Sequence, residues 1–219
     1  MNMKCKKPAG IFAVLFDLDG TLLDSVSTII IAARIVYEKM NIPFVEKDVR
    51  RLIGIPLKDQ ARMIAGNRAS EFIDLYRDVY RSLPDTGLFD GTIETLECLR
   101  NSNYRLSVVT SKVRKSAMRT LDATGLTRLF ECIITADDVS RPKPNSEPVL
   151  KALKLMDISA DQALFVGDSI HDIKCAHSAD VKITAVSWGA MSAEDLSQAK
   201  ADWVFDKWQD FRSFLCEKY

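Results

Sequence analysis

Residues 11–21 read IFAVLFDLDGT, an apolar run that ends in two aspartates, a glycine and a threonine. Every position from Ile11 to Phe16 is apolar, which is typical of a strand buried on both faces of a parallel sheet. Asp17 and Asp19 follow at once, so the run is too short for a membrane span or a signal sequence. We therefore expect the first strand of an α/β sheet, with two carboxylates at its carboxyl end.

Similar short apolar runs recur along the rest of the chain and predict five more strands. They lie at residues 106–110, 132–135, 163–166, 183–186 and 203–205. Segments with helical spacing separate them, at residues 92–100, 114–124, 147–156, 170–179 and 206–216. Strands that alternate with helices predict a mostly parallel sheet with helices on both faces.

The stretch from Asp24 to Asp85 breaks this alternation, because it contains no convincing strand. Its apolar residues recur at helical spacing, and it holds enough material for three or four helices. A crossover between parallel strands needs only one helix. We therefore expect a small all-helical domain at residues 24–85, inserted into an α/β core formed by residues 1–23 and 86–219.

Composition narrows the class of protein. The chain has 219 residues, with thirty Lys and Arg against thirty Asp and Glu, so its formal net charge is zero. Nucleic-acid-binding domains usually carry a basic excess, so we expect no nucleic-acid partner, and no membrane partner either. Five scattered cysteines without a CxxC pair predict reduced thiols and a cytoplasmic protein, which we expect to be a monomer or a weak homodimer.

Polar clusters follow the expected strands, where ligands bind in open α/β sheets. They lie at residues 17–21, 110–112, 141–144 and 167–172. Together they supply four carboxylates, as well as hydroxyl groups and lysines. Several oxygen ligands near one point suit Mg²⁺, which is a hard cation. Lys143 and Thr110 suit phosphate oxygens, and a carboxylate can accept a phosphoryl group in covalent catalysis.

In these clusters the sequence resembles the haloacid dehalogenase-like hydrolase superfamily. It is most similar to the branch with a helical cap after the first motif, which includes phosphoglycolate phosphatases, bacterial pyrophosphatases and β-phosphoglucomutases. The resemblance implies a Rossmann-like α/β core with an inserted helical cap. The matching motifs are Asp17–Thr21, Val109-Thr110, Lys143 and Gly167–Asp172, in the family's order along nearly the whole chain.

The resemblance assigns the reaction to the first motif. Asp17 would be the nucleophile that takes the phosphoryl group as an aspartyl-phosphate. Asp19 would act as general acid and then as general base on water, and its backbone carbonyl would ligate the metal. Because Asp19 is present, carbon–halogen hydrolysis is disfavoured.

The other motifs would hold the metal and the phosphoryl group. The resemblance makes Asp168 a further metal contact and has Asp172 support the metal or a bound water, so the expected Mg²⁺ site comprises Asp17, Asp19, Asp168 and Asp172. Thr110 and Lys143 would bind the phosphoryl oxygens, and Lys143 would offset the charge of Asp17. A phosphate dianion that faces four carboxylates would be repelled without the cation and this lysine.

Substrate selection is expected from the cap and from the second motif. Residues 54–57 resemble the cap loop that family members turn toward the substrate, so Gly54 and the nearby Arg51 are candidate substrate-binding residues. Ser111 is another, since residues 110–112 resemble the Thr-Asn-Lys of phosphoglycolate phosphatases, although Ser111 departs from the Asn of that pattern. Arg50 and Lys58 add basic charge to the cap. Lys112 is either a phosphate contact or a solvated lysine.

These features predict a Mg²⁺-dependent phosphoric monoester hydrolase for a small phosphorylated metabolite, most similar to phosphoglycolate phosphatase. Inorganic pyrophosphatase and β-phosphoglucomutase-type phosphotransferase activities remain open. A phospho-acceptor receiver domain is disfavoured, because its acceptor aspartate lies at a mid-chain strand and its chain is far shorter. A catalytically silent binding module is disfavoured too, because Asp17, Asp19, Lys143 and Asp168 are all present.

Overall fold

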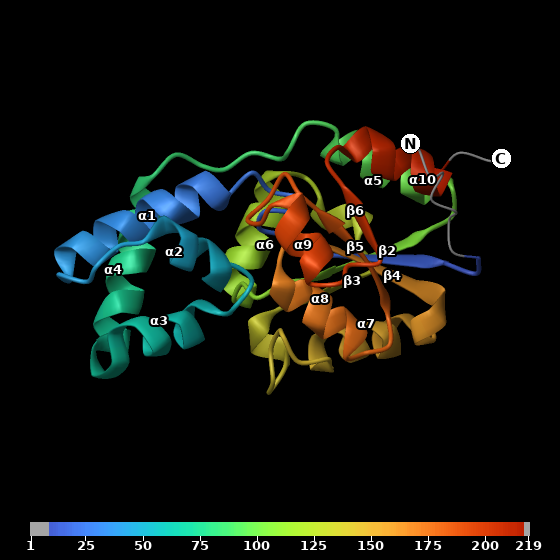
Figure 1. Cartoon of the computed structure of the whole chain (residues 1–219). Coiled ribbons are helices and arrows are strands. Elements are labelled where there is room, and N and C mark those ends of the chain that lie inside the picture. Colours follow the sequence, from blue (N-terminus) through green and yellow to red (C-terminus); the bar gives the residue numbers. More distant parts are fainter. Residues whose placement is uncertain (1–8, 217–219) are drawn as a thin grey trace.

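A computed structural model describes residues 9–216, so residues 1–8 of the expected core segment and residues 217–219 lie outside the described part. The strands are β1 (Ala13–Phe16), β2 (Arg105–Val109), β3 (Cys132–Ile134), β4 (Ala163–Gly167), β5 (Lys182–Val186) and β6 (Trp203–Phe205). They form one sheet in the order β3-β2-β1-β4-β5-β6, and every pair of neighbours is parallel (Figure 1). The sequence-based strands are confirmed to within two residues at each end.

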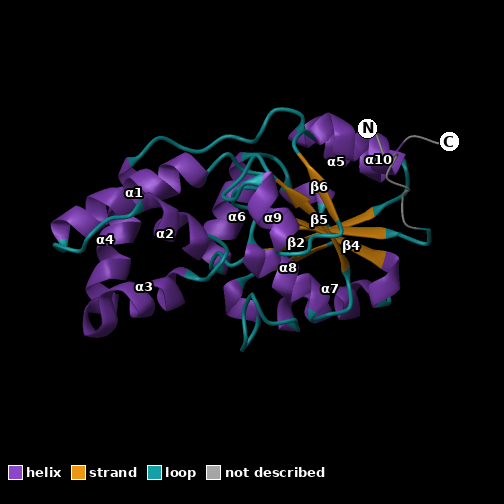
Figure 2. Ribbon diagram, viewed as in Figure 1, coloured by secondary structure: helices purple, strands orange, loops and turns teal. Residues whose placement is uncertain are grey.

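Two layers of helices cover the sheet (Figure 2). One layer contains α5 (Thr92–Asn101), α6 (Arg114–Ala123) and α10 (Trp208–Cys216). The other contains α7 (Glu147–Met156), α8 (Ile170–His177) and α9 (Ala193–Gln198). Strand β1 serves both layers, because Val14 and Phe16 pack into the first core and Ala13 and Leu15 into the second. All four of these side chains are fully buried, which explains the uninterrupted apolar run.

Helix α9 is the one element of the core layers that the spacing of apolar residues does not predict. It spans only six residues, and Leu196 is its only buried side chain. A helix this short shows no repeat of apolar positions. Its start is set instead by Ser192, whose hydroxyl accepts a hydrogen bond from the backbone N–H of Asp195.

The segment after β1 is helical, as expected. It contains α1 (Val26–Lys39), α2 (Glu46–Leu52), α3 (Leu57–Ala65) and α4 (Ala69–Ser82), and no strand is assigned between residues 24 and 85. Figure 1 shows these four helices as a group beside the sheet rather than in its two layers. Aromatic rings hold the group together, since Tyr37 packs edge-on against Phe72. The division at residues 24 and 85 stays a prediction.

Two linkers that run side by side connect this helical group to the sheet. Asp24 N–H donates to the Gly87 carbonyl at 3.0 Å, and Phe89 N–H donates to the Leu22 carbonyl at 3.1 Å. The first linker begins directly after the Asp17–Thr21 motif, so the helical group is attached at the carboxyl edge of the sheet. None of the helices within residues 9–216 has the length and apolar character that a membrane crossing requires.

Candidate active site

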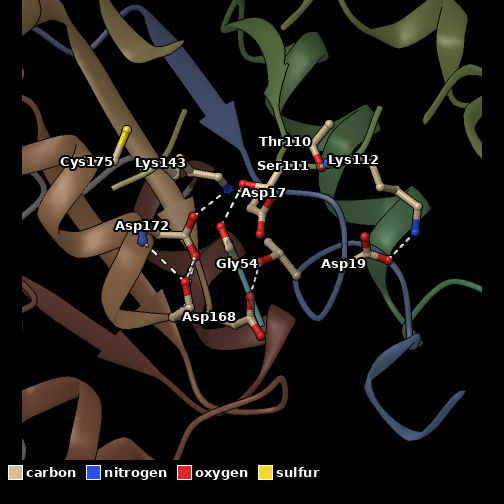
Figure 3. A network of polar contacts seen from close by, with 12 residues as sticks. Asp17, Asp19, Gly54, Thr110, Ser111, Lys112, Lys143, Asp168, Asp172 and Cys175 are labelled. Atoms are coloured by element: carbon tan, nitrogen blue, oxygen red, sulfur yellow. Dashed lines mark hydrogen bonds and ion pairs between the residues drawn. The ribbon is translucent and has the colours of Figure 1, made fainter. Parts of the chain in front are cut away.

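The polar clusters predicted at the strand ends come together at one point of the carboxyl edge (Figure 3). Asp17 follows β1, Asp168 follows β4, and Asp172 lies in the first turn of α8. Lys143 reaches the same point from the segment before α7. All four side chains are buried, with no more than 3% of any residue exposed.

Lys143 links two of the carboxylates. Its Nζ lies 2.8 Å from Asp17 Oδ1 and 2.7 Å from Asp172 Oδ1. Burial alone would lower the pKa of Lys143, but the charges of Asp17 and Asp172 raise it well above its ordinary value. The ammonium group therefore stays charged in the interior, where an unpaired cation would be strongly disfavoured.

The three buried carboxylates outnumber this cation. Asp17, Asp168 and Asp172 offer oxygen atoms that all lie within 4.8 Å of one another. Burial raises the pKa of Asp17 to about 7, although Lys143 works against the shift. Burial and the neighbouring Asp172 and Asp17 raise the pKa of Asp168 well above its usual range. Three hard oxygen donors with an uncompensated negative charge fit a divalent cation such as Mg²⁺.

Asp168 is fixed by backbone groups that approach it closely. Its Oδ2 accepts a hydrogen bond from Ala190 N–H at 2.6 Å, and its Oδ1 accepts one from the Thr21 hydroxyl at 3.3 Å. Gly20 has a φ of +76°, and a Cβ atom there would lie 2.1 Å from Asp168 Oδ2. A Cβ on Gly189 would lie 2.3 Å from the same oxygen. The motif glycine is thus required, and Gly189 is a second one that the motifs do not mark.

Asp172 has two partners that belong to different parts of the site. Its Oδ1 faces Lys143, while its Oδ2 accepts hydrogen bonds from the backbone N–H and the hydroxyl of Ser169 at 3.1 and 2.5 Å. The Ser169 hydroxyl in turn accepts from Asp172 N–H at 3.2 Å, which completes a capping box at the start of α8. Asp172 therefore orients Lys143 and begins the helix with the same side chain.

The Asp19 carboxylate is not part of the three-carboxylate cluster. Its Oδ1 accepts hydrogen bonds from the Ser25 hydroxyl at 2.7 Å and from Lys112 Nζ at 2.5 Å. A metal contact through the Asp19 backbone carbonyl therefore stays a prediction. Only 13% of the Lys112 side chain is exposed and it pairs with the Asp19 carboxylate, so it is not a solvated lysine, and a contact with phosphate stays a prediction. Ser25 was not singled out by any motif.

The second motif also meets the cap loop. Thr110 is buried, and its Oγ1 accepts the backbone N–H of Lys112 at 3.2 Å, so its hydroxyl hydrogen is available to a phosphoryl oxygen. The Ser111 hydroxyl donates to the Gly54 carbonyl at 2.6 Å. In this structure Ser111 therefore holds the cap loop, and its expected contact with substrate stays a prediction.

Gly54 itself lies against the core. Its φ is +97°, and a Cβ atom there would lie 2.6 Å from the Ser169 hydroxyl. Nearby, His171 Nε2 lies 2.8 Å from the Arg51 carbonyl oxygen. The loop between α2 and α3 is thus docked on the core by contacts with Ser111, Ser169 and His171.

A cavity of about 1100 Å³ opens over the site between the helical group and the sheet. It is lined by Asp17, Asp19, Thr110, Ser111 and Gly54. Its basic residues are Lys58, Arg62, Arg77, Arg81, Lys112, Lys115 and Arg119. The expected cap residue Lys58 is among them. Lys115 and Arg119 could have been found from the sequence, since they stand four residues apart on the helix that follows β2.

Arg51 lines another cavity than the other expected site residues, and its contact with substrate stays a prediction. It lines a separate cavity of about 320 Å³ together with Arg50, Lys47 and residues of the β5–α9 segment, and it is absent from the lining of the larger cavity. Arg51 lies in the last turn of α2, before the docked Gly54 loop. Its contact with the site passes through its backbone carbonyl and His171.

A parallel α/β sheet, a buried Asp–Lys–Asp cluster at its carboxyl edge and a helical group beside it define a hydrolase of the phosphatase class. The family model of haloacid dehalogenase-like hydrolases matches residues 14–186. The chain belongs to this family.

Relatives of known name cover nearly the whole chain. The chain is 34% identical over 202 residues to pyrophosphatase PpaX of Bacillus velezensis. This alignment covers 90% of this chain and 93% of that one. It is 31% identical to pyrophosphatase PpaX of Listeria monocytogenes, over 94% of this chain and 96% of that one.

Solved structures show the same architecture. A hydrolase from Pseudomonas syringae superposes with a TM-score of 0.84 at 29% identity and covers 93% of this chain and 97% of its own. A predicted phosphoglycolate phosphatase from Haemophilus somnus gives a TM-score of 0.80 at 28% identity, again over 93% and 97% of the two chains. The expected fold, a sheet of parallel strands with helices on both faces, is confirmed.

Proposed function

We propose that this protein is a Mg²⁺-dependent phosphohydrolase that transfers a phosphoryl group from a small anionic substrate to Asp17 and then to water. The observation that carries the proposal is Lys143, which is buried between Asp17 and Asp172 with Asp168 at the same point. This arrangement places one nucleophilic carboxylate beside a cation and beside two further metal-ligating carboxylates. A cytoplasmic location and a monomeric or weakly dimeric state stay predictions.

In the first step a carboxylate oxygen of Asp17 attacks phosphorus, and the bond from phosphorus to the leaving oxygen breaks. Oδ1 of Asp17 faces Lys143, which leaves Oδ2 for the attack. Lys143 and the Thr110 hydroxyl hold the phosphoryl oxygens, and Asp19 supplies a proton to a leaving oxygen that needs one. Bound Mg²⁺, held by Asp17, Asp168, Asp172 and the Asp19 backbone, would neutralise the carboxylates and polarise the phosphoryl group.

In the second step water attacks the phosphorus of the aspartyl-phosphate. Asp19 accepts the proton of the water, the bond between phosphorus and the Asp17 oxygen breaks, and inorganic phosphate leaves. The Asp17 carboxylate is restored and pairs with Lys143 again. Both steps use groups that the fold already holds in place, which is the condition for electrostatic stabilisation of a transition state.

Two substrates are supported by different observations. Inorganic pyrophosphate is favoured by the PpaX pyrophosphatases, which match more than nine-tenths of their own length at 31–34% identity. Phosphoglycolate, a monoester, is favoured by the resemblance of residues 110–112 and by structural neighbours such as the Haemophilus somnus protein. We propose pyrophosphate as the first candidate and phosphoglycolate as the second, while a β-phosphoglucomutase-type transfer stays a prediction.

A phosphate-release assay tests this proposal. The purified protein is incubated with Mg²⁺ and with pyrophosphate, phosphoglycolate or β-glucose 1-phosphate, and parallel reactions contain EDTA or the Asp17→Asn variant. We expect release from at least one substrate, dependent on Mg²⁺ and lost in the variant. Release from none of them, or full turnover by Asp17→Asn, would refute the mechanism.

A further inference from the structure

Lys112 is a second, partly buried cation of the site, and the steps above make no use of it. Its side chain is only 13% exposed, and its Nζ lies 2.5 Å from Asp19 Oδ1. Among residues 9–216, Asp19 is its only ion-pair partner. Figure 3 shows this pair on one side of Asp17, with Lys143 and Asp172 on the other side. The two lysines therefore serve different parts of the site.

Residues of the helical group hold the Asp19–Lys112 pair from two directions. Ser25, directly before α1, donates its hydroxyl to the same Asp19 oxygen at 2.7 Å. The Tyr80 ring, on α4, lies beneath Lys112, with Nζ 5.6 Å from the ring centroid. A cation over an aromatic face is attracted to it. Lys112 is therefore fixed by its surroundings rather than free to follow solvent.

The position of Lys112 matters because negative charge moves toward the leaving oxygen during the first step. When Asp17 attacks, negative charge develops on the oxygen that leaves phosphorus. In the proposed mechanism Asp19 interacts with that oxygen, and Lys112 Nζ is hydrogen-bonded to Asp19. Lys143 pairs with Asp17 and Asp172 and serves the transferred phosphoryl group in the proposed mechanism, so it is not the cation beside the leaving oxygen. A fixed cation beside the leaving oxygen stabilises an anion there more strongly than it would in water.

We propose that Lys112 determines specificity on the leaving-group side and favours a phosphoanhydride over an alkyl phosphate. In pyrophosphate the bond from phosphorus to the bridging oxygen breaks, and its electron pair stays on that oxygen. Inorganic phosphate then leaves as an anion that needs no proton and gains from the nearby ammonium. An alkoxide needs a proton from Asp19, and Lys112 competes for the Asp19 oxygen. This inference rests on the proposed function.

The test is the ratio of kcat/KM for pyrophosphate to kcat/KM for phosphoglycolate, measured with Mg²⁺ in Lys112→Met. We expect a loss of about 100-fold on pyrophosphate, the usual effect of removing one preorganised electrostatic group. On phosphoglycolate we expect a loss of about tenfold or less, so the ratio falls by about tenfold or more. A merely structural role for Lys112 would lower both values together and leave the ratio unchanged, which would overturn the proposal.

Two further variants keep the result interpretable. Lys115→Met removes a cation that lines the same cavity but pairs with no acidic side chain among residues 9–216, and it should leave the ratio within about twofold of the wild-type value. Lys112→Arg keeps the charge, so its ratio should stay near that of the wild type even if both rates fall. An equal change of the ratio in Lys112→Met and Lys115→Met would overturn a local role.

The wild-type protein separates this inference from the proposed function. If it hydrolyses phosphoglycolate well and pyrophosphate poorly, the role of Lys112 is overturned while the phosphohydrolase proposal stands. If it releases phosphate from no substrate with Mg²⁺, the proposed function itself fails.

Discussion

Asp168→Asn should make the metal-free protein more stable and the Mg²⁺-bound protein less stable than the wild type. Asp168 is fully buried, and its nearest charges include two other carboxylates against one lysine. Asparagine has nearly the same shape, and its amide oxygen can still accept the Ala190 N–H. The Thr21 hydroxyl can rotate to accept from the amide nitrogen.

The magnitude follows from the charge that is removed. Replacing a poorly compensated buried charge by a neutral isostere is expected to raise the free energy of unfolding by about 1–2 kcal/mol. For a chain of this size, each kcal/mol corresponds to about 2–4 °C in Tm, so the metal-free variant should melt about 2–8 °C higher. Mg²⁺ at 100 times its Kd should stabilise the wild type by about 2.7 kcal/mol. The variant should lose most of this stabilisation, because it lacks one of the proposed carboxylate ligands.

The assay is thermal unfolding followed by circular dichroism, in EDTA and in Mg²⁺. Because the folded-state pKa of Asp168 is raised, its ionisation destabilises the fold at pH values above its ordinary pKa, and the penalty shrinks as the pH falls. The advantage of the variant in EDTA should therefore be larger at pH 8 than at pH 5.

Asp180→Asn is the matched control, since Asp180 is exposed at a positive φ of 58° that asparagine also tolerates. We expect its Tm to stay close to that of the wild type in EDTA and in Mg²⁺. The expectation is wrong if Asp168→Asn has a lower Tm than the wild type in EDTA and if Mg²⁺ raises its Tm by as much as that of the wild type.

Three other predictions concern activity. Asp17→Asn should abolish turnover without lowering Tm in EDTA; a folded variant with wild-type turnover would exclude Asp17 as the nucleophile. Gly54→Ala should lower kcat/KM by about tenfold, because its Cβ would collide with the core and undock the loop. Gly66→Ala is its control, at positive φ with nothing within 4 Å, and equal losses in both would contradict the docking role. Lys58→Glu should raise KM for pyrophosphate several-fold while Arg51→Glu changes it little, and the reverse order would restore Arg51 to the catalytic cavity.

The order of the strands along the chain and the place of the polar motifs were predictable from the amino-acid pattern. The run from Ile11 to Phe16 is apolar at every position because both faces of β1 are buried. The strand could therefore be predicted without knowledge of the neighbouring strands. The carboxyl ends of parallel strands share one edge, so motifs at those ends had to meet there. That rule predicted the association of Asp17, Lys143 and Asp168 before any contact was known.

The tertiary structure decided which partner each polar side chain takes. Lys112 and Asp19 are separated by 93 positions, and nothing near Lys112 in the sequence marks it as an ion-pair partner. Arg51 stands near the Gly54 loop in sequence, but the docking of that loop leaves it outside the catalytic cavity. Local spacing encodes where a strand ends and which face is buried, because those depend on backbone geometry and burial alone. Pairings between distant side chains depend on how the helical group packs against the sheet, and only the folded chain fixes that.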